Sequence, residues 1–169
     1  SFEHKEIGTS IIQLMEKNEY KPYRYQLDAV MQALSIIEEH NGVIIADVVG
    51  LGKTIIACAV AKHLRKRGII ICPPGLIGDI NKTAGWKKYT DEFGLFDWDV
   101  RSRGDLKNAL HFVNDHDDIE VVIIDEAHSF RNQDTEDYEF LKNICRDKIV
   151  ILLTATPFNN KPSDILSLL

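Results

Sequence analysis

Residues 47–54 combine glycines with a lysine and a threonine between an apolar run and a helical pattern, and they read Asp-Val-Val-Gly-Leu-Gly-Lys-Thr. The glycines let the backbone curl so that successive N–H groups and the positive end of the helix dipole face an anion. Lys53 then supplies a positive charge for the β- and γ-phosphates of a nucleotide, and the Thr54 hydroxyl supplies a ligand for Mg²⁺. We therefore interpret the segment as a phosphate-binding loop (P-loop), in preference to a glycine-rich turn before a helix. The residues expected to contact the nucleotide here are Asp47, Gly50, Leu51, Gly52, Lys53 and Thr54.

An acidic pair follows a second apolar run, in the segment Asp125-Glu126-Ala127-His128. A carboxylate at the tip of a buried strand beside the P-loop strand can hold Mg²⁺, directly or through water. The next acid can orient or deprotonate an attacking water. We therefore expect Asp125 to be the metal carboxylate and Glu126 the general base. On its own such a pair is more typical of a solvated loop or an N-cap, and it is the P-loop upstream that favours the catalytic interpretation.

Two other segments carry hydrogen-bonding groups at positions where they can serve the same site. Thr154 and Thr156 follow the last apolar run, and small hydroxyl side chains there can form hydrogen bonds with residues 125–128, called the acidic loop below. Near the start of the chain, Gln26 has an amide that both donates and accepts, which suits the edge of adenine. The alternatives are a turn that stops a strand and an ordinary exposed glutamine at a helix start.

The elements that must position these residues alternate along the chain. Four short apolar runs are rich in β-branched residues and do not alternate with polar ones, which is typical of strands buried on both faces of a parallel sheet. These runs are residues 43–46, 69–72, 121–124 and 149–153, with a weaker candidate at 98–102. Apolar residues spaced by three to four predict helices over residues 24–40, 53–67, 105–113 and 135–146. The alternation predicts an α/β domain of three layers with a mainly parallel sheet, in which ligands bind beyond the carboxyl ends of the strands.

Length and composition fit one soluble domain. The chain has 169 residues, of which 44% are hydrophobic and 27% charged, and no apolar run approaches the ~18 residues that a membrane span needs. The sequence starts at Ser1 without an initiator Met or an apolar leader, so we expect an intracellular, cytoplasmic location and no membrane partner. The three cysteines lack metal-binding or disulfide spacing and are interpreted as reduced packing residues: Cys58, Cys72 and Cys145.

The charge of the chain is unevenly distributed. Its 20 basic and 26 acidic residues give a net charge of −6, which argues against binding nucleic acid by bulk charge alone. Residues 53–107, however, hold 11 Lys and Arg against 6 Asp and Glu, whereas residues 108–140 hold 1 against 10. One region of the molecule can therefore still present a basic face.

In this order, the segments resemble the first RecA-like lobe of a superfamily 2 helicase-type ATPase, most closely the bacterial Swi/Snf-type DNA translocases. The segments that carry the resemblance are Tyr25-Gln26 (Q motif), 47–54 (motif I), Cys72-Pro73-Pro74 with Leu76 (motif Ia), 125–128 (the DEAH form of motif II) and 153–157 (motif III). Residues 154–160 also resemble the extended motif III of the Swi/Snf type. The resemblance begins near Tyr23, so residues 1–22 are expected to be a helical lead-in and 23–169 the ATP-binding lobe.

The resemblance implies an ATP hydrolase that uses ATP and Mg²⁺, and it accounts for Asp47, since this family usually has Ala or Asp where other P-loops have glycine. Val48-Val49 departs from the Glu-Met that is common in the family. We expect this change to adjust phosphate binding and not to abolish it, because backbone groups of the loop bind the phosphate. The resemblance also implies that His128 couples the nucleotide site to Thr154 and Thr156.

Nucleic acid and a second lobe are the partners that the resemblance implies. Duplex DNA would lie along the cleft between two RecA-like lobes, facing Pro73 and Pro74, and the second lobe would follow this chain and supply arginines to the phosphoryl group. The isolated chain is therefore expected to hydrolyse ATP poorly. Candidates for a basic track are Arg101, Arg103, Lys87 and Lys88, with solvated helix faces as the alternative.

Three functions remain open at this stage. The extended motif III favours the motor lobe of a double-stranded DNA translocase. A strand-separating DNA or RNA helicase, or the motor subunit of a restriction enzyme, shares the same nucleotide chemistry. A non-catalytic nucleotide-gated binding module is the third, suggested by Val48-Val49 and by the absence of a second lobe from this sequence.

Overall fold

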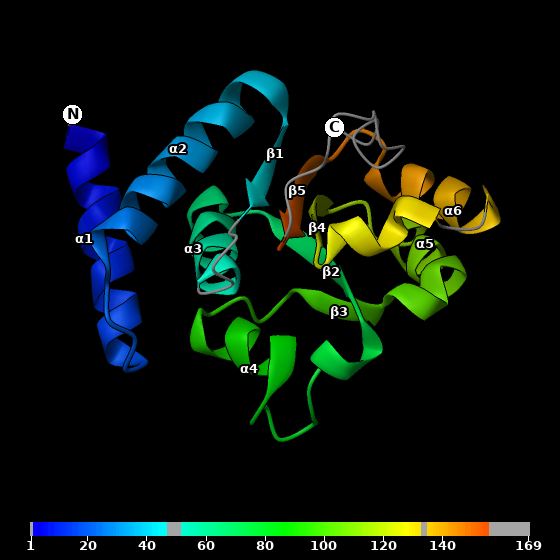
Figure 1. Ribbon diagram of the computed structural model, residues 1–169, viewed down its shortest axis with the longest axis horizontal. Helices are drawn as coiled ribbons and strands as arrows, with labels where there is room; N and C mark the ends of the chain where they lie inside the picture. The colour runs from blue at the N-terminus through cyan, green and yellow to red at the C-terminus, as the bar shows by residue number, and fades with distance from the viewer. Residues whose placement is uncertain (1, 47–51, 133–134, 156–169) are drawn as a thin grey trace.

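Five parallel strands form one sheet at the centre of the computed structural model, which describes residues 2–46, 52–132 and 135–155 (Figure 1). The strand order is β1-β5-β4-β2-β3, and every neighbouring pair is parallel. The strands are β1 (Gly42–Ala46), β2 (Arg67–Cys72), β3 (Asp99–Ser102), β4 (Ile119–Ile124) and β5 (Ile149–Thr154). The predicted α/β fold class is confirmed, and the sheet is parallel throughout the described residues.

Helices cover both faces of the sheet, which makes the three layers. The helices of the described residues are α1 (Phe2–Lys17), α2 (Arg24–His40), α3 (Lys53–Leu64), α4 (Gly85–Glu92), α5 (Leu106–Asn114) and α6 (Thr135–Cys145). Alternate residues of β2 point to opposite faces, so that Ile70 packs with the helices α1 to α4 while Ile71 packs with α5 and α6. In Figure 1, α1, α2 and α3 accordingly lie on one side of the sheet and α5 and α6 on the other. Burial on both faces explains why the strands are continuously apolar.

The order of the strands corrects one sequence-based expectation. The strand that ends at Asp125 was expected to lie beside the strand that precedes the P-loop, but β5 lies between β4 and β1. Ala46 is in register with Thr154, and Leu152 with Ile124, so the three strands end at the same edge. The expectation was wrong because apolar runs reveal that strands are buried but not which strands pair.

Two helices differ from the sequence-based expectation. The helix predicted over residues 53–67 ends at Leu64, because Arg65 adopts a left-handed backbone with φ of +55° and Arg67 already begins β2. The helix α4 was not predicted, since it buries only Trp86 and Thr90 within its eight residues.

The first helix is part of the core. Ile11 and Met15 of α1 are buried in the same cluster as residues of α2 and α3, and the hydroxyl of Tyr20 donates a hydrogen bond to Glu92 of α4 at 2.5 Å. The lead-in expected over residues 1–22 thus contains a helix that packs on the domain. None of the helices in the described part of the chain is both long and apolar enough to cross a membrane.

Candidate nucleotide-binding site

The N-terminus of α3 lies where the P-loop was predicted. Gly52 caps this helix with φ of +101°, a backbone conformation that favours glycine. A Cβ atom at Gly52 would lie 2.4 Å from Nε2 of Gln26, so glycine also permits the glutamine side chain to pack against this residue. Lys53, the first residue of α3, is only 8% exposed, and Thr54 is half-buried. Three of the predicted contacts lie outside the described residues: Asp47, Gly50 and Leu51.

Gln26 lies in the first turn of α2 and is buried, in contrast to the exposed glutamine that was the alternative. Its Oε1 atom is shielded from solvent and has no hydrogen-bond partner among the described residues. An unsatisfied buried acceptor costs about 1–3 kcal/mol. A ligand that presents an N–H group at this point would remove that cost, and the exocyclic amine of adenine is such a group.

Asp125 follows β4 and is also buried, with both carboxylate oxygens engaged. Its Oδ2 accepts a hydrogen bond from Nε1 of Trp86 at 2.8 Å, and its Oδ1 accepts one from the backbone N–H of Glu126 at 2.8 Å. Burial raises the pKa of the Asp125 carboxyl above its ordinary value, against the opposing effects of the Trp86 and Glu126 hydrogen bonds and of the Lys53 charge. A further positive charge at this carboxylate would favour its ionised form.

The acidic loop contacts the strand that separates β4 from β1. Glu126 has a left-handed backbone with φ of +51°, and its Oε2 lies 3.1 Å from Nε2 of His128. The other ring nitrogen of His128 lies 3.1 Å from the hydroxyl of Thr154, which is fully buried at the end of β5. The structure therefore brings together Glu126, His128 and Thr154, while Thr156 lies outside the described residues. Because β5 lies between β4 and β1, these contacts link residues 126–128 to the strand next to the one that precedes the P-loop.

The nucleic-acid candidates divide into two groups. Pro73 and Pro74 follow β2 at the edge of the sheet where the strands have their carboxyl ends, called the carboxyl-end edge below. Arg103 donates a hydrogen bond at 2.7 Å to the hydroxyl of Ser129, which directly follows the acidic loop. Arg101 is instead paired with Asp99 and lies over the Phe112 ring. Of the two lysines, Lys88 lies 3.8 Å from Glu92, and Lys87 is half-buried on α4.

Sequence reasoning missed Trp86 and Ser129, which contact the predicted site residues. Trp86 precedes its partner by 39 positions and lies on a short helix that carries no motif. Its indole N–H would have been a reason to look for a buried acceptor, because a buried indole N–H usually has a partner. The partner itself follows only from the fold.

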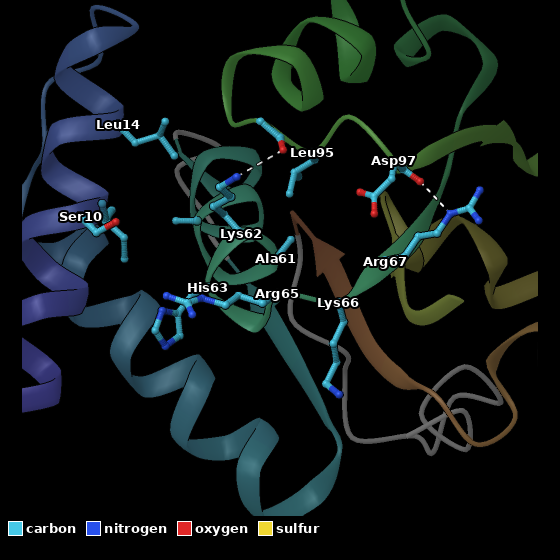
Figure 2. Close-up of a pocket in the computed structure, with 13 residues that line it drawn as sticks. Ser10, Leu14, Ala61, Lys62, His63, Arg65, Lys66, Arg67, Leu95 and Asp97 are labelled. Atoms are coloured by element: carbon cyan, nitrogen blue, oxygen red, sulfur yellow. Dashed lines mark hydrogen bonds between the residues drawn. The ribbon is translucent and has the colours of Figure 1, made fainter. Parts of the chain in front are cut away.

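The opposite edge of the sheet, where the strands begin, contains a pocket with several basic side chains. This pocket of about 470 Å³ lies between α1, the end of α3 and the start of β2 (Figure 2). Two of its cations bond to backbone carbonyls: Lys62 donates to the carbonyl of Gly94 at 3.3 Å, and Nε of Arg67 donates to the carbonyl of Asp97 at 2.9 Å. None of the sequence-predicted site residues lines this pocket.

Oxygen donors for a magnesium ion are present, but protein ligands alone do not make a complete site. Among the described residues no group of three or more His, Cys, Asp and Glu side chains could hold a metal ion together. Mg²⁺ is commonly held by one or two protein oxygens together with nucleotide phosphates. The Thr54 hydroxyl and the Asp125 carboxylate are oxygen donors of the kind that such a site uses.

A glycine-capped helix with a buried lysine, an acid at a strand end and a threonine on the strand between them define a P-loop domain of the RecA-like class. Solved structures support this fold. The SWI2/SNF2 ATPase core of Sulfolobus solfataricus in complex with dsDNA matches with a TM-score of 0.62 and 23% identity, over 86% of this chain and 34% of that one. The Hef helicase domain of Pyrococcus furiosus matches with a TM-score of 0.54 and 18% identity, over 85% of this chain and 35% of that one.

Sequence comparisons add matches to a domain family and to helicases. The SNF2-related domain matches residues 97–169. The uncharacterized ATP-dependent helicase YqhH of Bacillus subtilis is 31% identical over 88% of this chain and 29% of its own length. The probable ATP-dependent DNA helicase CHR12 of Arabidopsis thaliana is 26% identical over 92% of this chain and 16% of its own length. Together these matches make the chain similar in sequence to one part of SNF2-related ATP-dependent helicases, and similar in fold to RecA-like helicase domains. The chain spans less than a third of the length of these two relatives.

Proposed function

We propose that this chain is the ATP-binding motor lobe of a DNA-dependent ATPase that moves along duplex DNA when the lobe is joined to a second one. The observation that carries the proposal is the burial of Lys53 and Asp125 at one edge of the sheet, beside a glutamine whose Oε1 has no partner among the described residues. These groups supply a cation for phosphate, a carboxylate for a metal ion and an acceptor for a base.

Each described residue has a definite part in this proposal. Lys53 binds the β- and γ-phosphates, and Gln26 binds the edge of adenine. Thr54 and Asp125 hold Mg²⁺, which when bound neutralises charge on the phosphate oxygens. Glu126 orients the attacking water and takes its proton, while His128 holds the Glu126 carboxylate and contacts Thr154.

The proposal that DNA is the partner rests on the neighbour structure and on the position of three residues. The Sulfolobus ATPase core was solved with double-stranded DNA. Pro73, Pro74 and Arg103 lie at the same edge as the nucleotide site, so a nucleic-acid backbone bound there would lie close to the acidic loop. Phosphate contacts of this kind position a protein without reading sequence. A cytoplasmic location stays a prediction.

ATPase assays of the complete protein test the proposal. We expect duplex DNA to stimulate hydrolysis more than single-stranded DNA or RNA does. Failure of duplex DNA to stimulate would exclude the translocase proposal.

A strand-separating helicase is the second candidate, because relatives carry helicase names, among them a putative ATP-dependent RNA helicase of Acanthamoeba polyphaga mimivirus that is 25% identical. It predicts stronger stimulation by single strands or RNA and displacement of a labelled strand. The third candidate, a nucleotide-gated binding module, predicts that the complete protein binds ATP and never turns it over.

A further inference from the structure

The indole of Trp86 makes a buried hydrogen bond to the carboxylate that the proposed function assigns to the metal ion. Trp86 is 2% exposed, and its Nε1 donates to Oδ2 of Asp125 at 2.8 Å. The two residues are 39 positions apart and lie on different elements, α4 and the end of β4. Their contact is therefore a product of the tertiary fold.

The backbone that carries Trp86 is held tightly. Gly85 has φ of +65°, and a Cβ atom there would lie 2.6 Å from the carbonyl oxygen of Leu76 and 2.7 Å from the backbone nitrogen of Gly78. The backbone N–H of Lys87 donates to the carbonyl of Ile77 at 3.0 Å. The turn before α4 is thus packed against the start of the helix, which fixes the direction in which the indole points.

The hydrogen bond from Trp86 completes the fixation of the carboxylate. One oxygen of Asp125 accepts from its neighbour's backbone and the other accepts from the indole, so rotation of the carboxylate plane would break at least one of the two bonds. Each oxygen keeps a further lone pair for a metal ion or its water. Partners that orient a ligating carboxylate in this way tune metal affinity as well as geometry.

We propose that Trp86 is a positioning residue for Asp125, which it holds in the orientation that binds the magnesium ion of the bound nucleotide. This inference rests on the proposed function, because it takes Asp125 to be the metal carboxylate. It predicts that loss of the indole N–H weakens the response to Mg²⁺ and leaves metal-free nucleotide binding intact.

Two variants of the complete protein separate positioning from packing. Trp86→Phe removes the N–H and part of the ring. Site-specific replacement of Trp86 by 3-benzothienylalanine removes the N–H and keeps the size and shape of the ring, so it serves where the phenylalanine variant fails to fold. Trp98→Phe is the matched control, because Trp98 is also buried but packs against Gly68 at the opposite edge of the sheet.

The measurement is the affinity for a fluorescent ADP analogue, mant-ADP, over a series of Mg²⁺ concentrations and in EDTA. In both Trp86 variants we expect the Mg²⁺ concentration that gives half of the affinity gain to rise about 10- to 100-fold, with unchanged affinity in EDTA. The Trp98→Phe control is expected to match the wild type in both.

Two results would overturn the inference. One is a benzothienylalanine variant with the Mg²⁺ dependence of the wild type. The other is a variant whose affinities in Mg²⁺ and in EDTA fall together, which is the behaviour of a purely structural residue. If the wild type itself shows no gain from Mg²⁺, the metal assignment in the proposed function fails as well, so the two failures are distinguishable.

Discussion

At the carboxyl-end edge of the sheet, Lys53 and Asp125 are buried, and the Gln26 Oε1 atom beside them has no partner among the described residues. At the opposite edge two ion pairs join side chains that are more exposed. Arg67 lies 3.0 Å from Asp118, and Lys66 lies 3.4 Å from Glu120. The same kinds of side chain therefore occur in two environments within one domain. One edge holds buried charged groups and an acceptor without a partner among the described residues, and the other holds ion pairs that are more exposed.

The energetic reason for this difference is solvation. Burying a polar or charged group without a partner costs free energy, so a fold keeps such a group only where something else repays the cost. An exposed ion pair costs little and contributes little, because water and salt screen it. The pocket in Figure 2 is lined by several basic side chains, but Lys62 and Arg67 already donate hydrogen bonds to backbone carbonyls there.

The largest effect is expected from Glu126→Gln in the complete protein. Removing the general base should lower the rate of ATP hydrolysis by about 10²- to 10⁴-fold with little change in nucleotide affinity. Glu120→Gln is the matched control, because Glu120 lies at the other end of β4 and pairs with Lys66. Turnover that survives in Glu126→Gln would remove Glu126 as the base.

Lys53→Ala is expected to weaken ATP binding by at least about tenfold, because charge-assisted hydrogen bonds to phosphate are lost. Lys62→Ala on the same helix should leave the affinity unchanged, since Lys62 bonds to the carbonyl of Gly94 at the opposite edge. Equilibrium titration with ATP checks both. Equal losses of ATP affinity in the two variants would contradict the assignment of phosphate binding to Lys53.

Gln26→Ala is expected to reduce the preference for ATP over GTP by up to about tenfold, the value of one hydrogen bond. Because the substitution also removes a buried acceptor that has no partner among the described residues, thermal stability without nucleotide should stay constant or rise. Competition binding and thermal unfolding measure the two effects. Gln32→Ala, on the exposed face of α2, is the control. A marked loss of stability without nucleotide would show that the Gln26 amide is satisfied by the protein itself.

The smallest effect is expected from Asp118→Asn. The Arg67 guanidinium holds the pKa of the Asp118 carboxyl below its ordinary value. A lowered folded-state pKa stabilises the fold above the unfolded value of about 3.9, and this contribution is lost as the pH falls through the folded pKa. Asp118→Asn should therefore lower Tm by at most about 3 °C at pH 7, with the difference disappearing in acid. A difference that grows in acid would contradict the assignment.

Much of the fold follows from local patterns in the sequence. The apolar runs around Ile45, Ile71 and Ile123 predicted buried parallel strands, because a strand covered on both faces has no polar side. The polar segments after these runs predicted which residues share one edge of the sheet, because parallel strands end at one edge. The end of α3 could not be predicted, since the left-handed Arg65 and the pairing of Arg67 with β4 depend on the tertiary structure.

Contacts between distant segments could not be predicted either. The position of β5 between β1 and β4 is a matter of strand pairing, which the apolar pattern does not encode. The bond between Trp86 and Asp125 joins two elements whose separation in sequence carries no periodic signal. A hydrogen bond from Thr154 to the acidic segment was expected from the residues, and His128 as the partner was expected from the resemblance; the coupling role of His128 stays a prediction.

The most direct test of the account is amide hydrogen exchange in the complete protein with and without ATP and Mg²⁺. We predict slower exchange on nucleotide binding at residues 52–54 and 125–128, at the carboxyl-end edge. We predict no change at residues 62–67 and 94–97, which include residues that line the pocket of the opposite edge. Protection confined to the opposite edge would contradict the assignment of the nucleotide site.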